Sequence, residues 1–77
     1  MVRASNTARH VKIREVLIQL RTRTGLTQTD LAGLLKRPQS FVSKYERGAR
    51  RLDVVELLEI LGALDVSVCD FLNLIGE

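Results

Sequence analysis

Residues with helix-capping spacing divide this 77-residue sequence into short segments, and this punctuation constrains the fold more than any other feature. In a capping box, one side chain bonds the backbone N–H three residues later, and the later side chain reaches back. Three pairs of residues have this spacing: Thr27 with Asp30, Asp53 with Glu56, and Ser67 with Asp70. No run alternates apolar and polar residues well enough to indicate a strand. The sequence therefore predicts an all-α fold.

Apolar residues recur at helical spacing between these punctuation points. The expected helices cover residues 7–24, 27–35, 38–47, 53–65 and 67–75. Gly25 is suited to cap the end of the first helix, and Pro38 to be the first residue of the third, where its missing N–H costs nothing. Residues 1–6 lie outside the pattern and are interpreted as a flexible N-terminal arm. Residues 7–77 are interpreted as one compact domain.

The titratable residues exclude several functional classes. Cys69 is the only cysteine and His10 the only histidine, so neither a disulfide nor a cysteine-based zinc site is expected. With no nucleophile–base pair or converging carboxylates, the chain is not expected to be an enzyme, and no cofactor is predicted. No secretory signal or membrane-length apolar stretch is visible, which favours the reducing cytoplasm. Cys69 itself is interpreted as a small apolar filler.

Charge is distributed unevenly along the chain. All twelve Lys and Arg residues lie within residues 1–51, with only three acidic residues, so this portion carries a net charge of +9. Residues 52–77 hold six acidic residues and no basic ones, a net charge of −6. We expect the basic portion to meet a polyanion and the acidic end to face away from it.

Residues 28–47 are the informative stretch. Two helices of about eight residues are joined there by a turn too short for an antiparallel arrangement, so they must cross steeply, as in a helix-turn-helix. Ala32 supplies the small side chain needed where the helices touch. Gln39 on the outward face of the second helix suits bidentate pairing with adenine, and Lys44 suits donation to guanine.

Two runs then resemble a known family. Residues 26–32 (LTQTDLA) and 39–48 (QSFVSKYERG) closely resemble the Cro/C1-type, or XRE-like, helix-turn-helix regulators, and the resemblance extends from about residue 13 to residue 72. The resemblance implies a compact five-helix, lambda-repressor-like domain whose helix-turn-helix is formed by helices 2 and 3. It also implies that the domain binds double-stranded operator DNA as a two-fold homodimer, with residues 38–47 in the major groove.

Matching positions in the family give the expected site residues. Those expected to contact bases are Gln39, Ser40, Ser43 and Lys44. Those expected to contact phosphates are Gln28, Arg37, Arg47, Arg50 and Arg51. Two positions depart from the family pattern. Lys36 stands where Gly is usual, so a side chain must adopt a left-handed conformation at a cost of about 1 kcal/mol, or the turn must be remodelled. Arg37 stands where an apolar residue is common.

The last segment carries more apolar surface than one short helix can bury. Phe71, Leu74 and Ile75 are therefore expected at a dimer interface, the alternative being that they complete the core of a single chain. Phe41 is expected to pack against neighbouring helices rather than to touch a thymine methyl group.

The function predicted from these features is that of a transcriptional regulator, of repressor or controller type. It would bind an inverted repeat whose half-sites lie about 34 Å apart. One alternative is an antitoxin that neutralises a partner toxin through its acidic carboxyl portion and autoregulates. A second is an interaction module that keeps the fold without reading DNA.

Overall fold

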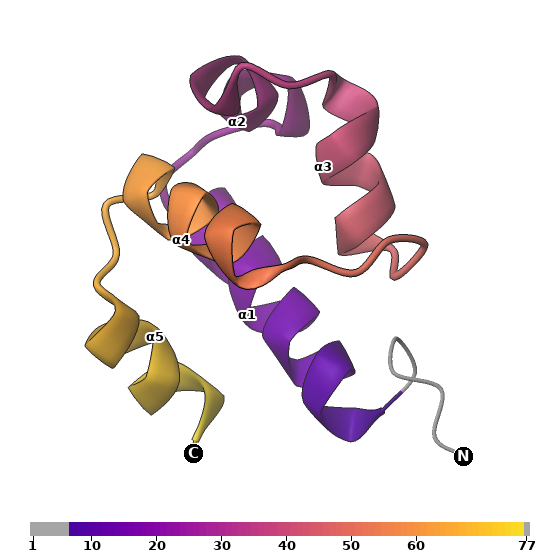
Figure 1. Cartoon of the computed structure of the whole chain (residues 1–77). Coiled ribbons are helices and arrows are strands. Elements are labelled where there is room, and N and C mark those ends of the chain that lie inside the picture. The colour runs from indigo at the N-terminus through magenta and orange to yellow at the C-terminus, as the bar shows by residue number, and fades with distance from the viewer. Residues whose placement is uncertain (1–6, 77) are drawn as a thin grey trace.

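Five α-helices make up the part of the chain that the structure, a computed structural model, describes, residues 7–76. They are α1 (Ala8–Arg23), α2 (Gln28–Leu35), α3 (Gln39–Glu46), α4 (Val54–Ala63) and α5 (Val68–Ile75). Helix α2 packs on α3 and α4, α1 on α3 and α5, and α4 on α5. Figure 1 shows α2 crossing α3 at one end of the molecule, while α5 lies on the opposite side of α1 and α4 from α3. The all-α, five-helix prediction is confirmed. The predicted N-terminal arm, residues 1–6, lies outside the described residues.

The capping residues act largely as the sequence predicts. Two of the three predicted capping boxes form in full: the Thr27 and Asp53 side chains each accept from the backbone N–H three residues on, and their own N–H groups donate to the side chains of Asp30 and Glu56. The Ser67 hydroxyl accepts from the Asp70 N–H at the start of α5. Pro38 differs from its predicted position: its backbone is extended, so it precedes α3 as the N-cap instead of being the first helical residue.

The turn between α2 and α3 is closed by Lys36 in a left-handed conformation, with φ 57° and ψ 42°. Its N–H donates to the Gly33 carbonyl, and the next N–H, of Arg37, donates to the Ala32 carbonyl. These bonds satisfy carbonyls at the end of α2 that the helix itself leaves unpaired. The turn therefore has the left-handed conformation that glycine usually supplies, although Lys36 occupies the position.

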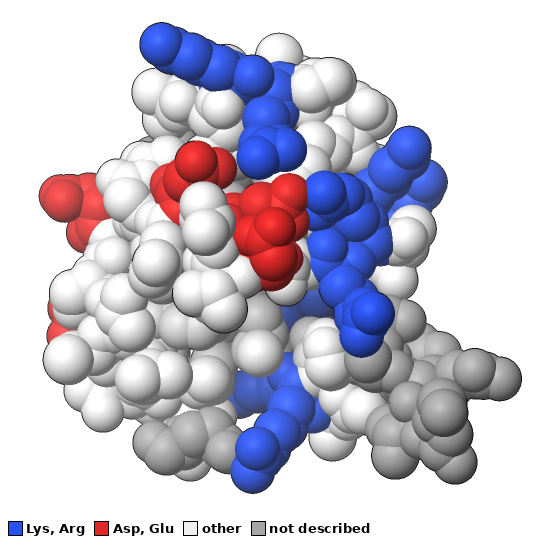
Figure 2. All heavy atoms as spheres, viewed as in Figure 1, with Lys and Arg blue, Asp and Glu red and all other residues white. Residues whose placement is uncertain are grey.

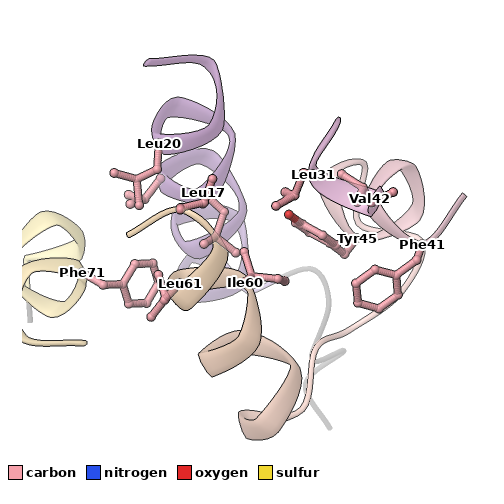
Figure 3. Packing of buried hydrophobic residues seen from close by; sticks show 12 residues of the cluster. Leu17, Leu20, Leu31, Phe41, Val42, Tyr45, Ile60, Leu61 and Phe71 are labelled. Atoms are coloured by element: carbon pink, nitrogen blue, oxygen red, sulfur yellow. The ribbon is translucent and has the colours of Figure 1, made fainter. Parts of the chain in front are cut away.

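Twelve apolar residues form one core among the described residues, drawn from all five helices and the end of α4. Figure 3 shows Phe71 reaching from α5 toward Leu61 of α4, and Tyr45 lying beside Leu31 at the contact between α3 and α2. The Phe41 and Tyr45 rings meet edge to face, with their centroids 5.6 Å apart. Phe41 is buried, so its interpretation as a packing residue is confirmed.

Two expectations near the C-terminus need correction. Phe71 was expected at a dimer interface, but only 2% of its surface is exposed, and its ring completes the core of the single chain. Cys69 was expected to be an apolar filler, but it lies exposed in the first turn of α5. Both differences arise because a helix of eight residues has one inward face. Phe71 occupies that face, and Cys69 does not.

The loop after α3 lies against α1. Gly48 has a φ of +81°, and a Cβ placed on it would lie 2.8 Å from the guanidinium carbon of Arg14. Glycine adopts this backbone angle without the strain that a side chain would bring. The start of the α3–α4 loop therefore lies beside the Arg14 side chain from the middle of α1. No helix among the described residues is long and apolar enough to cross a membrane.

Candidate nucleic-acid interface

Helix α3 crosses α2 at one end of the molecule (Figure 1), and the outward face of α3 carries polar side chains. Gln39, Ser40 and Lys44 are exposed, and Ser43 is half-buried. The opposite face carries Phe41, Val42 and Tyr45, which are all buried. Because inward residues anchor the helix at both ends, the outward side chains are held at a fixed height above the core. A helix exposed in this way can enter a major groove.

A partly buried ion pair anchors the C-terminal end of α3 to α1. The Arg21 guanidinium donates to both carboxylate oxygens of Glu46, with Nε to Oε2 at 2.7 Å and Nη2 to Oε1 at 3.0 Å. The hydrogen bonds to Glu46 also raise the pKa of the Arg21 guanidinium above its ordinary value. A third donation, from Arg21 Nη1 to the Leu26 carbonyl at 2.8 Å, ties the α1–α2 connection to the same group. Paired in this way, the buried carboxylate is satisfied by hydrogen bonds.

This carboxylate continues into a chain of amide hydrogen bonds that reaches the outer face of α3. Gln28 Nε2 donates to Glu46 Oε1 at 2.9 Å, and Gln39 Nε2 donates to Gln28 Oε1 at 2.7 Å. An ionised carboxylate can only accept, so the direction of every bond in the chain is fixed. Gln39 therefore keeps its amide oxygen, together with one N–H, for another partner.

On the other flank of α3, two arginines stack on one aromatic ring. The guanidinium carbon of Arg37 lies 4.5 Å from the centre of the Phe41 ring, and that of Arg50 lies 4.9 Å from it. Arg37 precedes α3 and Arg50 follows it. Contact with a ring face stabilises a guanidinium without using its N–H groups. Phe41 thus contacts one arginine side chain from before α3 and one from after it.

The Glu56 carboxylate of α4 pairs with both of these arginines. Its oxygens accept from Arg50 Nη1 at 2.8 Å and Nη2 at 2.7 Å, and from the Asp53 N–H at 3.0 Å. Arg37 Nη1 lies 3.6 Å from Glu56 Oε2. The hydrogen bond from Arg50, reinforced by the Asp53 N–H and the charge of Arg37, lowers the pKa of Glu56 to about 2. Glu56 is therefore ionised throughout the physiological range.

The expected separation of charge is incomplete. The acidic C-terminal portion was expected to face away from the basic helices, yet Glu56 and Glu59 both lie against Arg37. Figure 2 shows acidic side chains on this face flanked by basic ones. The reason is geometric: α4 packs on α2, so its first turns run beside the helix-turn-helix. The net charge of a segment of the sequence therefore does not by itself give the charge of the surface on which that segment lies.

The structure brings the predicted site residues together in two groups. Gln28 and Gln39 are hydrogen-bonded to each other. Arg37 and Arg50 both contact the Phe41 ring and the Glu56 carboxylate. The remaining ones, Ser40, Ser43, Lys44, Arg47 and Arg51, lie on α3 or just beyond it. Their contacts with DNA remain predictions.

Sequence reasoning missed the supporting carboxylates and Arg21. Glu46 is buried although it lies at the end of a polar helix, and Glu56 is buried although its spacing with Asp53 indicates only a cap. The apolar neighbours of Glu46 at helical spacing are the one signal that could have placed it inward.

Metal-ligating side chains do not gather anywhere in residues 7–76: no group of three or more His, Cys, Asp or Glu residues there could hold an ion. The single histidine, His10, instead places its Nδ1 2.6 Å from the Thr7 hydroxyl at the start of α1.

Comparison with known proteins agrees with this architecture. A family model described as a helix-turn-helix domain matches residues 13–72. The restriction-modification controller protein C.Esp1396I is 28% identical, with 91% of each chain covered and a TM-score of 0.86. The controller protein C.AhdI from Aeromonas hydrophila is 38% identical over 79% of this chain and 92% of its own, with a TM-score of 0.73.

A further structure of C.Esp1396I, 28% identical and covering 91% of this chain and 92% of that one with a TM-score of 0.85, is a tetramer in complex with its natural 35 base-pair operator. No curated protein sequence matches the chain. The family model covers most of the chain, and the solved structures share its five-helix fold. The chain therefore belongs to the helix-turn-helix family of Cro/C1-type regulators.

Proposed function

We propose that this protein is a sequence-specific transcriptional regulator that binds a palindromic double-stranded operator as a homodimer. The observation that carries the proposal is the fixed chain of hydrogen bonds from Glu46 through Gln28 to Gln39. A solvated surface helix has no need of a buried carboxylate to orient an exposed glutamine. The operator complex of C.Esp1396I supports the same function for a relative of this fold.

Gln39 is the residue proposed to read sequence. Because Gln28 occupies one of its N–H groups, Gln39 can still offer its amide oxygen and the second N–H. Adenine presents a matching pair in the major groove, with N6–H₂ as donor and N7 as acceptor. Ser40, Ser43 and Lys44 lie on the same helix and are proposed to contact neighbouring base edges. Gln28, Arg37, Arg47, Arg50 and Arg51 are proposed to contact the backbone, where contacts position the domain without reading bases.

The pairing surface is proposed to lie on α5. Leu72 and Leu74 are each 44% exposed, and Ile75 is half-buried beside them. An apolar face of this kind, repeated by two-fold symmetry, covers itself in a dimer. Since α5 lies away from α3 (Figure 1), a dimer through α5 leaves both recognition helices free. Two such helices would reach successive major grooves about 34 Å apart.

The proposed role is regulation and not catalysis. We propose that the protein acts in the cytoplasm, because operator DNA lies there. Likeness to C.Esp1396I and C.AhdI supports control of a restriction-modification system as the biological role. The fraction of operator DNA that is bound would set the level of transcription.

Selection of bound duplexes from a random pool tests the function directly. We expect an inverted repeat with adenine in each half-site at the position read by Gln39. Gln39→Ala should weaken binding to the selected duplex by about 1–3 kcal/mol and relax preference at that one base pair. Gel shifts at fixed salt measure both effects.

Gln19→Ala is the matched control, because Gln19 is an exposed glutamine on α1. It should leave the affinity and the preference unchanged. Recovery of no common sequence from the pool would contradict sequence-specific regulation. An unchanged preference in Gln39→Ala would remove Gln39 from base reading while leaving the wider proposal standing.

A further inference from the structure

The two arginines that flank α3 are candidates for phosphate contact, yet neither has its guanidinium free. Arg50 directs both terminal nitrogens at Glu56, and Arg37 lies within 3.6 Å of both Glu56 and Glu59. The Phe41 ring holds the two guanidinium groups in place from the inside. The Glu56 carboxylate on α4 therefore pairs with one arginine on each side of α3, Arg37 before it and Arg50 after it.

The pairing between Arg50 and Glu56 has the geometry by which arginine holds a phosphate. Two parallel N–H donors meet two oxygens at 2.8 and 2.7 Å. A DNA phosphate offers the same pair of oxygens to the same two donors. Glu56 and a phosphate therefore compete for the same N–H groups of Arg50.

The Glu56 side chain is 8% exposed, whereas those of Arg50 and Arg37 are 39% and 35% exposed. The arginines are reachable from solvent, and the carboxylate lies behind them. A phosphate approaching from outside would meet guanidinium groups whose charge is already partly neutralised.

We propose that Glu56 is a positioning residue that competes with DNA phosphates for Arg50 and Arg37 and so limits the sequence-independent part of the affinity for duplex DNA. The inference rests on the proposed function, since it concerns the backbone contacts of the same surface. Phosphate contacts are present on every sequence, so restraining them lowers the affinity for operator and non-operator duplexes alike. The share of the binding energy that comes from base contacts then rises.

Salt dependence provides the measurement, because it counts phosphate contacts. Each contact adds about 0.9 to the slope of log K against log salt concentration. Release of Arg50 alone should steepen the slope by about 0.9. Binding to a scrambled duplex would then rise roughly eight-fold for each ten-fold dilution of salt, relative to the unmodified protein.

Glu56→Gln is the variant of choice because it separates this role from the capping role of the same residue. The glutamine oxygen can still accept from the Asp53 N–H, so the box at the start of α4 is kept. The amide is neutral and holds the arginines less strongly. Glu56→Asp is a second variant that keeps the charge but withdraws it by one methylene group. Asp30 closes the box of α2 in the same position, which indicates that α4 will still form.

The experiment measures affinity for the selected operator duplex and for a scrambled duplex of the same composition, across a salt series. We expect Glu56→Gln to bind both duplexes more tightly, each with a steeper slope, and to leave the ratio of the two affinities nearly unchanged. Glu56→Asp should shift the affinities and the slopes in the same direction by less. Adding Arg50→Gln to Glu56→Gln should return the slope toward its original value. Glu15→Gln, the same substitution at an exposed residue of α1, should change neither the slope nor the ratio beyond the effect of one added charge.

An unchanged slope in Glu56→Gln overturns the inference. Equal loss of affinity for both duplexes with an unchanged slope overturns it too, because that result assigns Glu56 a purely structural role. If the unmodified protein does not prefer its selected duplex over the scrambled one, the proposed function itself has failed. The two failures are thus distinguishable in one series.

Discussion

At Lys36 the chain adopts a conformation that glycine would take without strain. A left-handed backbone with a Cβ costs about 1 kcal/mol or more, and Lys36 has a φ of 57°. Lys36 is exposed, so nothing in the packing prevents a change there. The turn therefore carries a small, local and removable strain.

Lys36→Gly should raise the free energy of unfolding by roughly 0.5–1 kcal/mol, because it relieves this strain. Urea denaturation followed by circular dichroism measures the change. Lys36→Ala is the control: it removes the charge and the long side chain but keeps the Cβ. Equal stabilisation by alanine would show that charge, and not backbone conformation, sets the stability at this position.

Single residues also mark where sequence reasoning succeeds. At Lys36 the resemblance to the family left open a left-handed residue or a remodelled turn, and the structure has the left-handed residue. The expectation that Phe41 packs against neighbouring helices is confirmed. The pairing of Arg21 with Glu46 joins residues 25 positions apart, and no local pattern encodes it. Such partners are found only when the helices are placed in space.

At the scale of the helix, the N-terminus of α4 combines two tasks in one carboxylate. Glu56 accepts a hydrogen bond from the Asp53 N–H and also accepts from Arg50. In the described part of the chain, Asp30 and Asp70, the acids in the first turns of α2 and α5, hydrogen-bond with their capping residues, Thr27 and Ser67. Hydrogen bonds from Thr27 alone lower the pKa of Asp30. Glu56 thus links the cap of α4 to the helix-turn-helix.

This linkage predicts how stability depends on pH. Because the pKa of Glu56 falls from its ordinary 4.5 to about 2 on folding, its contribution is complete above about pH 5 and is lost as the pH falls toward 2. Glu56→Gln should therefore lie furthest below the unmodified protein in unfolding free energy near pH 6, and the difference should shrink toward pH 2. Thermal unfolding across this range measures it. A difference that stays constant with pH would show that the Glu56 carboxylate gains nothing from its partners.

The helices themselves were predictable because their signals are local. Capping residues and apolar spacing placed all five, with errors of one or two residues such as the position of Pro38. Burial along α5 was less predictable, because its apolar residues exceed one face and nothing local says which of them turns inward. Phe71 was therefore assigned to the wrong surface.

At the scale of the whole molecule, α5 carries the proposed pairing surface on the far side from α3. Leu74→Asp should raise the dissociation constant of the dimer by roughly ten-fold to a hundred-fold, because a buried leucine contributes about 1.5–3 kcal/mol. Sedimentation equilibrium over a concentration series measures this constant.

Leu34→Asp provides the matched control for Leu74→Asp, since Leu34 is 57% exposed on α2. It should leave the association unchanged. If Leu34→Asp disrupts the dimer and Leu74→Asp does not, the pairing surface lies on α2 and not on α5.

The close contact between Arg14 and Gly48 has a further consequence for the whole molecule. Together with the pair formed by Arg21 and Glu46, it places the C-terminal end of α3 against α1. Because its C-terminal end is anchored in this way, α3 cannot change its tilt to fit a major groove of a different shape. Under the proposed function, the elastic cost of fitting then falls on the duplex. Untouched bases between the half-sites would enter the affinity through their stiffness, with flexible pyrimidine–purine steps favoured over rigid A-tracts.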